Sequence, residues 1–376
     1  MSILLKEVTT TRGLRTFIRF PHSLVRSNDA WVPALDMDEM NTLHWDKNPA
    51  FEHCQAHYFL ACQNGRPVGR IAAIYNPLHR DTWGQHYLRF GWIDFIDDPE
   101  VSAALMDKVD SWAKELGCTA VHGPMGFTDL DREGMLVDGF DELATLATRH
   151  DQPYYHEHLE RLGFRKDADW LEHEVDVTAE MGERVSRVAA TALKRYKLEV
   201  VLFKNKKQLL PYAHELFEIL NEAYSHLYGV VHLSDTQIDA YVKQYLGFVN
   251  TDLLPVVLDE TGRMVGFTIA MPSLSRALQK SKGRLFPFGF IHLLSALRRF
   301  DRVDMYLGGV REEYKGRGVN AIMMDTFFQS LRKYGVKRVH ANPQMETNHA
   351  VLEQWQYFTV RHHKTRRIYI KHLADT

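Results

Sequence analysis

The sequence has few cysteines and no pattern that would pair them. Its 376 residues include three cysteines, Cys54, Cys62 and Cys118. An odd number of cysteines without a Cys-x-x-Cys pair fits neither a disulfide framework nor a zinc site of that type. We therefore expect a reducing compartment, and the sequence predicts a cytoplasmic protein.

Long apolar segments are also missing. No apolar run reaches the roughly 18 residues that a membrane-spanning helix requires. The first residues, Met1 to Glu7, lack the basic start and apolar core of a secretory signal. We therefore expect no stable membrane insertion.

A strong excess of charge of either sign is absent, and so is a clear metal motif. Lys and Arg number 46 against 48 Asp and Glu, which gives a net charge of −2. Nucleic-acid binding draws on positive charge, so no nucleic-acid partner is expected. Among the 20 histidines, His362 and His363 are adjacent. Neighbouring residues of a strand point to opposite faces, so the pair is a poor chelate and no metal is expected.

Two segments of the chain share a pattern that indicates an internal duplication. Residues 59–74 and 255–270 each read as an apolar strand, a turn ending in Gly-Arg, and a second strand. Each is followed by a strand, a helix with apolar residues at spacings of three and four, and a short strand. The length exceeds what one core usually supports. We therefore predict two α/β domains, residues 1–178 and 179–376, each with a mixed central sheet flanked by helices.

An insertion of about residues 275–300 interrupts the second half. It mixes Lys and Arg with the apolar run Leu285 to Ile291. Such a mixture suits an interfacial helix or a lid over an apolar substrate. It equally suits a helix packed between the domains whose basic side chains extend into solvent.

In the second half, the loop that follows the strand at residues 303–310 has the features of an anion site. A strand ends at Gly309 and Val310, a basic turn follows, and an apolar-striped helix starts near Val319. Glycines allow backbone amides to approach a ligand closely, and a helix N-terminus favours phosphate. We predict that the loop binds phosphate through its backbone and its basic side chains, in the run Lys315, Gly316, Arg317, Gly318, Val319 and Asn320.

This loop resembles the pyrophosphate loop of the GNAT superfamily of N-acetyltransferases, Arg/Gln-x-x-Gly-x-Gly/Ala. Lys315 and Asn320 depart from that pattern, and the other positions agree with it. The resemblance implies that the loop binds acetyl-CoA or another acyl-CoA. It also assigns Asn348 to the asparagine at the start of the family's last conserved helix.

The first half resembles the same fold without a working loop. Its corresponding segment, residues 95–102, carries carboxylates and a proline where the glycines would lie. Those charges would repel pyrophosphate, so we expect this half to be structural or to bind substrate. Further along, Asp129, Asp131 and Glu133 alternate in a glycine-bounded loop. This loop would recognise a cationic amine or form a turn held by side-chain bonds to the backbone.

The resemblance implies an acyl-CoA-dependent N-acyltransferase, with acetyl as the first expected acyl group. The acceptor would be a small-molecule or peptide amine. Asp304, Glu346 or a carboxylate of the first half could act as base, directly or through water, and amides near Gly309 and Val310 could stabilise the oxyanion. The family's spacing places its tyrosine acid at Trp355, so Tyr357 is the candidate acid. A non-catalytic acyl-CoA sensor or scaffold, and a peptidyltransferase that uses aminoacyl-tRNA, are the alternatives.

Overall fold

The computed structural model describes residues 2–25, 28–178 and 183–373, which form two compact units. Unit 1 comprises Met1–Trp170, Ser275–Leu293 and Lys364–Thr376, and unit 2 comprises Leu171–Leu274 and Leu294–His363. The expected ranges 1–178 and 179–376 are continuous, whereas these units are not. The expected start of the second domain at residue 179 lies outside the described residues.

The sheet of unit 1 begins with four antiparallel strands. These are β1 (Leu4–Glu7), β2 (Gln55–Gln63), β3 (Arg66–Tyr75) and β4 (Tyr87–Phe95). Strand β5 (Ala120–Gly123) is parallel to β4, and the end of β14 (Val360–His372) is antiparallel to β5. Strand β6 (Met135–Asp138) pairs with β14 as well.

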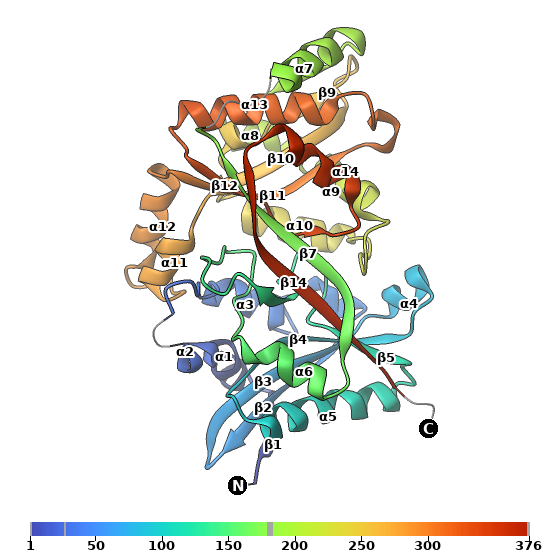
Figure 1. The fold of residues 1–376 in the computed structure, drawn as a ribbon, viewed down its shortest axis with the longest axis vertical. Coiled ribbons are helices and arrows are strands. Elements are labelled where there is room, and N and C mark those ends of the chain that lie inside the picture. The colour runs from blue at the N-terminus through green and yellow to red at the C-terminus, as the bar shows by residue number, and fades with distance from the viewer. Residues whose placement is uncertain (1, 26–27, 179–182, 374–376) are drawn as a thin grey trace. The chain divides into compact units, whose positions relative to one another are not determined.

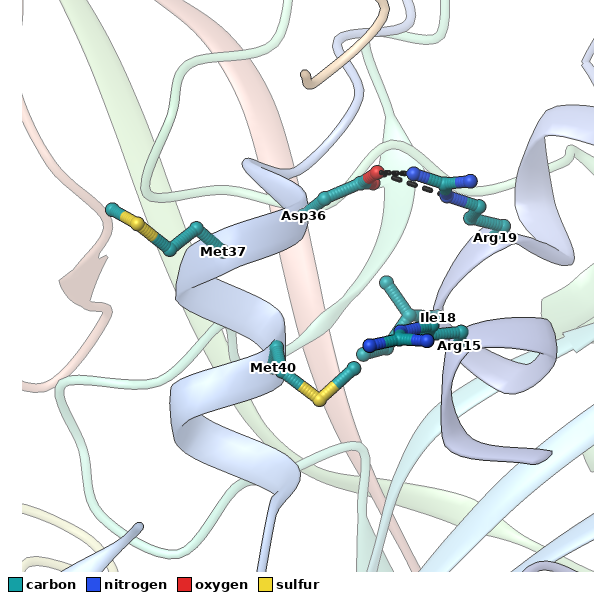
Figure 2. Close-up of a pocket in the computed structure, with 6 residues that line it drawn as sticks. All are labelled: Arg15, Ile18, Arg19, Asp36, Met37 and Met40. Carbon is teal, nitrogen blue, oxygen red and sulfur yellow. Dashed lines mark hydrogen bonds and ion pairs between the residues drawn. The ribbon is translucent and has the colours of Figure 1, made fainter. Parts of the chain in front are cut away.

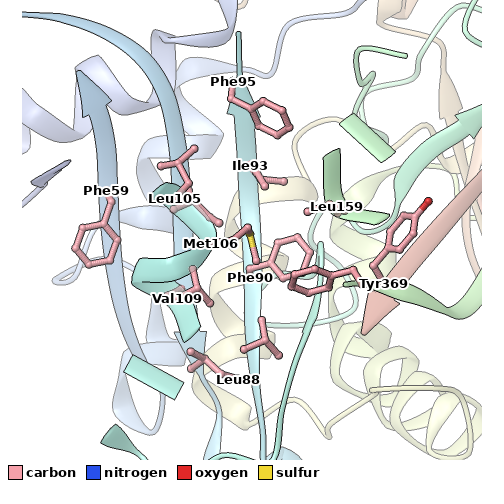
Figure 3. Close-up of a cluster of buried hydrophobic side chains, with 14 of the residues drawn as sticks. Phe59, Leu88, Phe90, Ile93, Phe95, Leu105, Met106, Val109, Leu159 and Tyr369 are labelled. Atoms are coloured by element: carbon pink, nitrogen blue, oxygen red, sulfur yellow. The ribbon is translucent and has the colours of Figure 1, made fainter. Parts of the chain in front are cut away.

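The core of unit 1 lies between this sheet and α5 (Pro99–Glu115) (Figure 3). Asp98 caps the first turn of α5 by accepting a hydrogen bond from the Glu100 amide. The apolar stripe of the helix, which includes Leu105 and Val109, packs against strand residues such as Phe90. The other helices of this unit are α1 (Thr11–Arg19), α2 (Pro21–Leu24), α3 (Asp36–Leu43), α4 (Pro77–Trp83), α6 (Tyr154–Arg161) and α11 (Ser275–Ser281).

Unit 2 repeats the same order of elements. Its sheet runs from the end of β7 (Arg165–Asp176) through β12 (Arg338–His340), β11 (Arg302–Val310), β10 (Met264–Pro272) and β9 (Val256–Leu258) to β8 (Glu199–Val201). The β11–β12 pair is parallel, whereas the β10–β11, β9–β10, β7–β12 and β8–β9 pairs are antiparallel. The duplicated pattern of two antiparallel strands, a third strand, a helix and a parallel strand is therefore present in both units.

Helix α13 (Val319–Lys333) covers the sheet of unit 2 and packs beside α7 (Glu183–Arg195) (Figure 1). Its predicted apolar stripe is buried, including Val319, Ile322 and Phe327. The remaining helices of this unit are α8 (Lys206–Leu209), α9 (Ala213–Tyr224), α10 (Asp235–Tyr245) and α14 (His349–Leu352), while α12 (Gly289–Arg298) is shared by the two units. The predicted α/β class, with mixed sheets flanked by helices, is confirmed.

The three cysteines, Cys54, Cys62 and Cys118, are buried and free. Within the described ranges no helix is long and apolar enough to cross a membrane. The same residues include no group of three or more His, Cys, Asp or Glu side chains that could hold a metal ion.

Candidate functional site

Strand β11 carries an irregularity just before the predicted loop. Ile269 of β10 faces Leu307, but the next residue, Ala270, faces Met305, so Tyr306 is an extra residue on β11. Such bulges bend a strand and often occur next to functional sites. After the bulge, Gly309 and Val310 pair with β10, and the chain then leaves the sheet through a short 3-10 turn, Glu312–Tyr314.

The predicted loop has the backbone of an anion site. Gly316 and Gly318 have φ angles of 73° and 81°, in the left-handed region. Gly318 is the N-cap of α13, and no side chain caps that end. The amides of Gly316, Gly318, Val319 and Asn320 have no hydrogen-bond partner among the described residues. Unpaired amides at the start of a 15-residue helix favour a bound anion.

Two basic side chains flank these amides. Lys315 Nζ lies 2.5 Å from Glu312 Oε2, and Lys315 is exposed. The Arg317 guanidinium lies over the rings of Tyr314 and Tyr196, at 5.1 and 5.5 Å from their centroids. Both cations are therefore held at the loop without being buried, where an arriving phosphate could compete with Glu312 for Lys315.

Strands β11 and β12 pair over three residues only. Arg302 to Asp304 face Arg338 to His340, and β11 then continues to Val310 without a described partner on that side. The Asn342 side-chain amide donates a hydrogen bond to the Tyr306 carbonyl oxygen at 3.1 Å. The point where pairing stops is occupied by Asp304 and His340, which are directly opposite each other.

A buried acid–histidine–acid arrangement lies at this point. Asp304 is 2% exposed, and its Oδ1 lies 3.3 Å from His340 Nδ1. The other ring nitrogen, Nε2, lies 3.1 Å from Glu174 Oε2 on β7. That bond to His340 is the main reason why the pKa of Glu174 falls to about 2. The contact between Asp304 and His340 lacks hydrogen-bond geometry, so neither carboxyl oxygen of Asp304 has a hydrogen-bond partner in the described structure.

His340 and Glu174 were not among the predicted site residues. The sequence did contain one indication for His340, which ends the short strand after α13. If that strand pairs in parallel with β11, His340 lies opposite Asp304. Glu174 had no comparable signal, since β7 reaches unit 2 from the first half of the sequence.

The remaining predicted residues follow β12. Asn348 is the N-cap of α14, although its side chain makes no capping bond, and Glu346 is part-buried in the preceding turn. Trp355 is buried and donates its Nε1 hydrogen to Gln344. Tyr357 is part-buried against the core, with the Arg184 guanidinium 5.3 Å from its ring centroid. Trp355 is therefore a core residue.

The acidic loop of unit 1 forms a turn held by its own side chain. Asp131 Oδ2 accepts hydrogen bonds from the amides of Phe127 and Thr128 at 2.8 and 3.2 Å. Burial raises the pKa of Asp129 to about 6 and that of Asp131 to about 7, and it also raises the pKa of Glu133 well above its ordinary value. The bonds of Asp131 agree with the structural interpretation of this loop, while recognition of an amine by it stays a prediction.

These raised pKa values predict how the stability of unit 1 depends on pH. Between the ordinary carboxyl pKa of 3.8 and about 7, the folded state keeps a proton on Asp131 that the unfolded state has lost. Stability should therefore fall as pH rises through this window and level off above it. Asp131→Asn keeps an oxygen for both amides and should reduce this fall in the melting temperature by at least about 3 °C between pH 5 and 8. An unchanged pH dependence in the variant would contradict the assignment.

A shallow pocket of about 210 Å³ lies elsewhere in unit 1, between α1 and α3 (Figure 2). Arg19 faces Asp36 across its edge and makes an ion pair with it, and Met40 faces Ile18 and Arg15. None of the predicted site residues lines this pocket, so it does not correspond to the loop of unit 2.

Comparisons with known proteins identify the fold. No protein-family model matches the sequence. A tandem GNAT protein from the clavulanic acid biosynthesis pathway aligns over 100% of both chains, with a TM-score of 0.57 at 10% sequence identity. The chain has a tandem GNAT fold. A GCN5-related glucosamine N-acetyltransferase region of a fungal multi-domain β-N-acetylglucosaminidase gives a TM-score of 0.59 at 13% identity, over 98% of this chain and 38% of that one.

Two curated proteins resemble this chain over nearly its whole length. Protein YghO of Escherichia coli is 27% identical over 98% of this chain and 95% of its own. The bacterial ceramide synthase of Caulobacter vibrioides is 28% identical over 97% of this chain and 96% of its own. The expected resemblance to GNAT proteins is thus confirmed at the level of the fold.

Proposed function

We propose that this tandem GNAT protein is an acyl-CoA-dependent N-acyltransferase whose donor site is the loop of unit 2. The observation that carries the proposal is the set of unpaired amides at the N-terminus of α13, those of Gly316, Gly318, Val319 and Asn320. A pyrophosphate would accept their hydrogen bonds, and Lys315 and Arg317 would add charge. Asn348 is the further residue proposed to contact the cofactor.

We assign the chemistry to the point where β11 and β12 separate. Asp304 would accept the amine proton, because its carboxyl oxygens are buried and lack hydrogen-bond donors among the described residues. His340 contacts Asp304 on one side and Glu174 on the other, so its role is to position the base. Amides near Gly309 and Val310 would stabilise the oxyanion.

Tyr357 remains the proposed acid, which returns a proton to the leaving thiolate. It lies on the same short helix as buried Trp355 but is more accessible to solvent. Glu346 stays a second proposed base, in the turn before α14. The proposed roles of Tyr357 and Glu346 depend on how the substrate binds.

The acceptor class is suggested by the ceramide synthase relative. A ceramide is the amide of a fatty acid with a long-chain amino alcohol, and the relative covers 97% of this chain. We therefore propose a long-chain primary amine as acceptor and a fatty acyl-CoA as donor. Acetyl-CoA, the first expectation from the loop alone, is the comparison donor, and a cytoplasmic location stays a prediction.

Thiol release tests this function directly. Purified protein is mixed with acetyl-, octanoyl- or palmitoyl-CoA and a long-chain 2-amino-1,3-diol, and both free thiol and the amide are measured. We expect amide and thiol in equal amounts, fastest with a long acyl donor, and Tyr357→Phe should slow release by roughly 10–100-fold. Acyl-CoA binding without thiol release on any amine would instead favour the sensor or scaffold. Amide formation only from aminoacyl-tRNA would favour the peptidyltransferase.

A further inference from the structure

The insertion that follows β10 is fixed at its base and exposed at its tip. Helix α11 is anchored in unit 1, because Ser275 donates a hydrogen bond to the Ala144 carbonyl and Gln279 donates to the carbonyls of Asp29 and Trp31. The Asp36 amide donates to the Gly283 carbonyl at 2.8 Å. Both interpretations of this insertion assumed a single element, whereas the structure has two helices, α11 and α12, joined by a tip at residues 282–288.

The tip exposes large apolar side chains. Phe286 and Phe288 are 76% and 69% exposed, and Phe290 and Ile291 at the start of α12 are 40% and 51% exposed. The rings of Phe286 and Phe290 lie near each other, with centroids 6.2 Å apart. Most apolar side chains of this size are buried in a folded chain, so four neighbouring exposed ones mark an interaction surface.

The charged side chains of the insertion itself are all basic. Residues 275–300 contain six Lys and Arg residues and no Asp or Glu. The six are all exposed: Arg276, Lys280, Lys282, Arg284, Arg298 and Arg299. The start of α3 lies next to Gly283 and adds the exposed side chain of Met37 (Figure 2). Its first turn carries three acids, of which Asp36 is paired with Arg19 and Glu39 accepts a hydrogen bond from the Trp92 ring, while the third is Asp38.

We propose that this tip docks the protein on an anionic lipid surface. Exposed Phe and Ile side chains gain free energy by entering the boundary between headgroups and acyl chains, and basic side chains next to them attract anionic headgroups. A protein partner with an acidic, apolar groove would need matching concave shape. A bilayer interface needs only this combination of apolar tip and basic rim, which is why we favour it. The inference does not depend on the proposed acyl transfer.

Vesicle sedimentation tests the docking with the full chain. Vesicles of phosphatidylcholine alone are compared with vesicles that contain about 30% phosphatidylglycerol. We expect wild type to sediment with the anionic vesicles, and Phe286→Ser combined with Phe288→Ser to lower the partition coefficient at least tenfold. Lys280→Glu combined with Arg284→Glu should lower it as well, and about 0.5 M salt should weaken wild-type binding.

A matched pair of substitutions controls for loss of surface apolarity in general. Leu4→Ser combined with Leu210→Ser removes two other exposed apolar side chains, 58% and 51% exposed, and should leave binding unchanged. All three double variants change exposed positions, so equal melting temperatures are expected and are checked first. Wild type that does not sediment with anionic vesicles, or Phe variants that sediment as well as wild type, would overturn the proposal.

Discussion

Gly316→Ala is expected to weaken acyl-CoA binding by roughly tenfold or more, measured as loss of the ligand-induced rise in melting temperature. Gly316 has a φ of 73°, and an added Cβ would meet no described atom within 4 Å. The substitution therefore does not create a clash inside the protein. It strains the left-handed backbone and places a methyl group among the amides that would bind pyrophosphate.

Gly335→Ala provides a matched control in the same unit. Gly335 also has a positive φ, 68°, with nothing within 4 Å of an added Cβ, and it lies at the other end of α13. Both variants should lose about 1–2 kcal/mol of stability for the same backbone reason. Only Gly316→Ala should lose acyl-CoA binding. If both variants keep the ligand-induced shift, the cofactor binds elsewhere; if both lose it, the effect is one of folding.

Asp304→Asn is expected to lower kcat by about 10²–10⁴-fold, with little change in the KM for acyl-CoA. The amide has nearly the shape of the carboxyl group but cannot accept a proton from the amine. The measurement is the initial rate of thiol release at saturating donor. A variant that binds acyl-CoA normally and keeps its full rate would remove Asp304 from the mechanism.

His340→Gln separates the positioning role from that of the base. The His340 ring lies between Asp304 and Glu174. Its loss changes the surroundings of the base but leaves the base in place, so the pH–rate profile should shift while some activity remains. Glu174→Gln is the parallel variant, since it removes only the far carboxylate. A fall in rate at all pH values that follows the fall in melting temperature would indicate a purely structural role for the histidine.

Much of the fold was predictable because the chain repeats itself. The hairpin turns, the strand that ends at Val310 and the helix that begins at Val319 all follow from local patterns of apolar residues and glycines. The backbone of the loop that we propose as the anion site was predictable for the same reason, since its glycines and helix start are consecutive in sequence.

The proposed catalytic centre was less predictable because it depends on strand register. Asp304 was a candidate among several acids, but its partner His340 becomes visible only when β11 and β12 are paired in parallel. Glu174 is 130 residues before Asp304, which is the difference between the two residue numbers. Local sequence patterns do not indicate which residues pair when they are so far apart in the sequence.

Strands β7 and β14 each run through both units, which matters for any attempt to express one unit alone. The sheet of unit 1 is completed by Tyr369 to His372, at the very end of the chain, and the sheet of unit 2 is completed by Glu174 to Asp176, from the first half. No single cut in the gene therefore yields either unit intact. A duplicated ancestor could have been halved into two working modules, but in this chain each module carries a strand that the other half of the gene encodes.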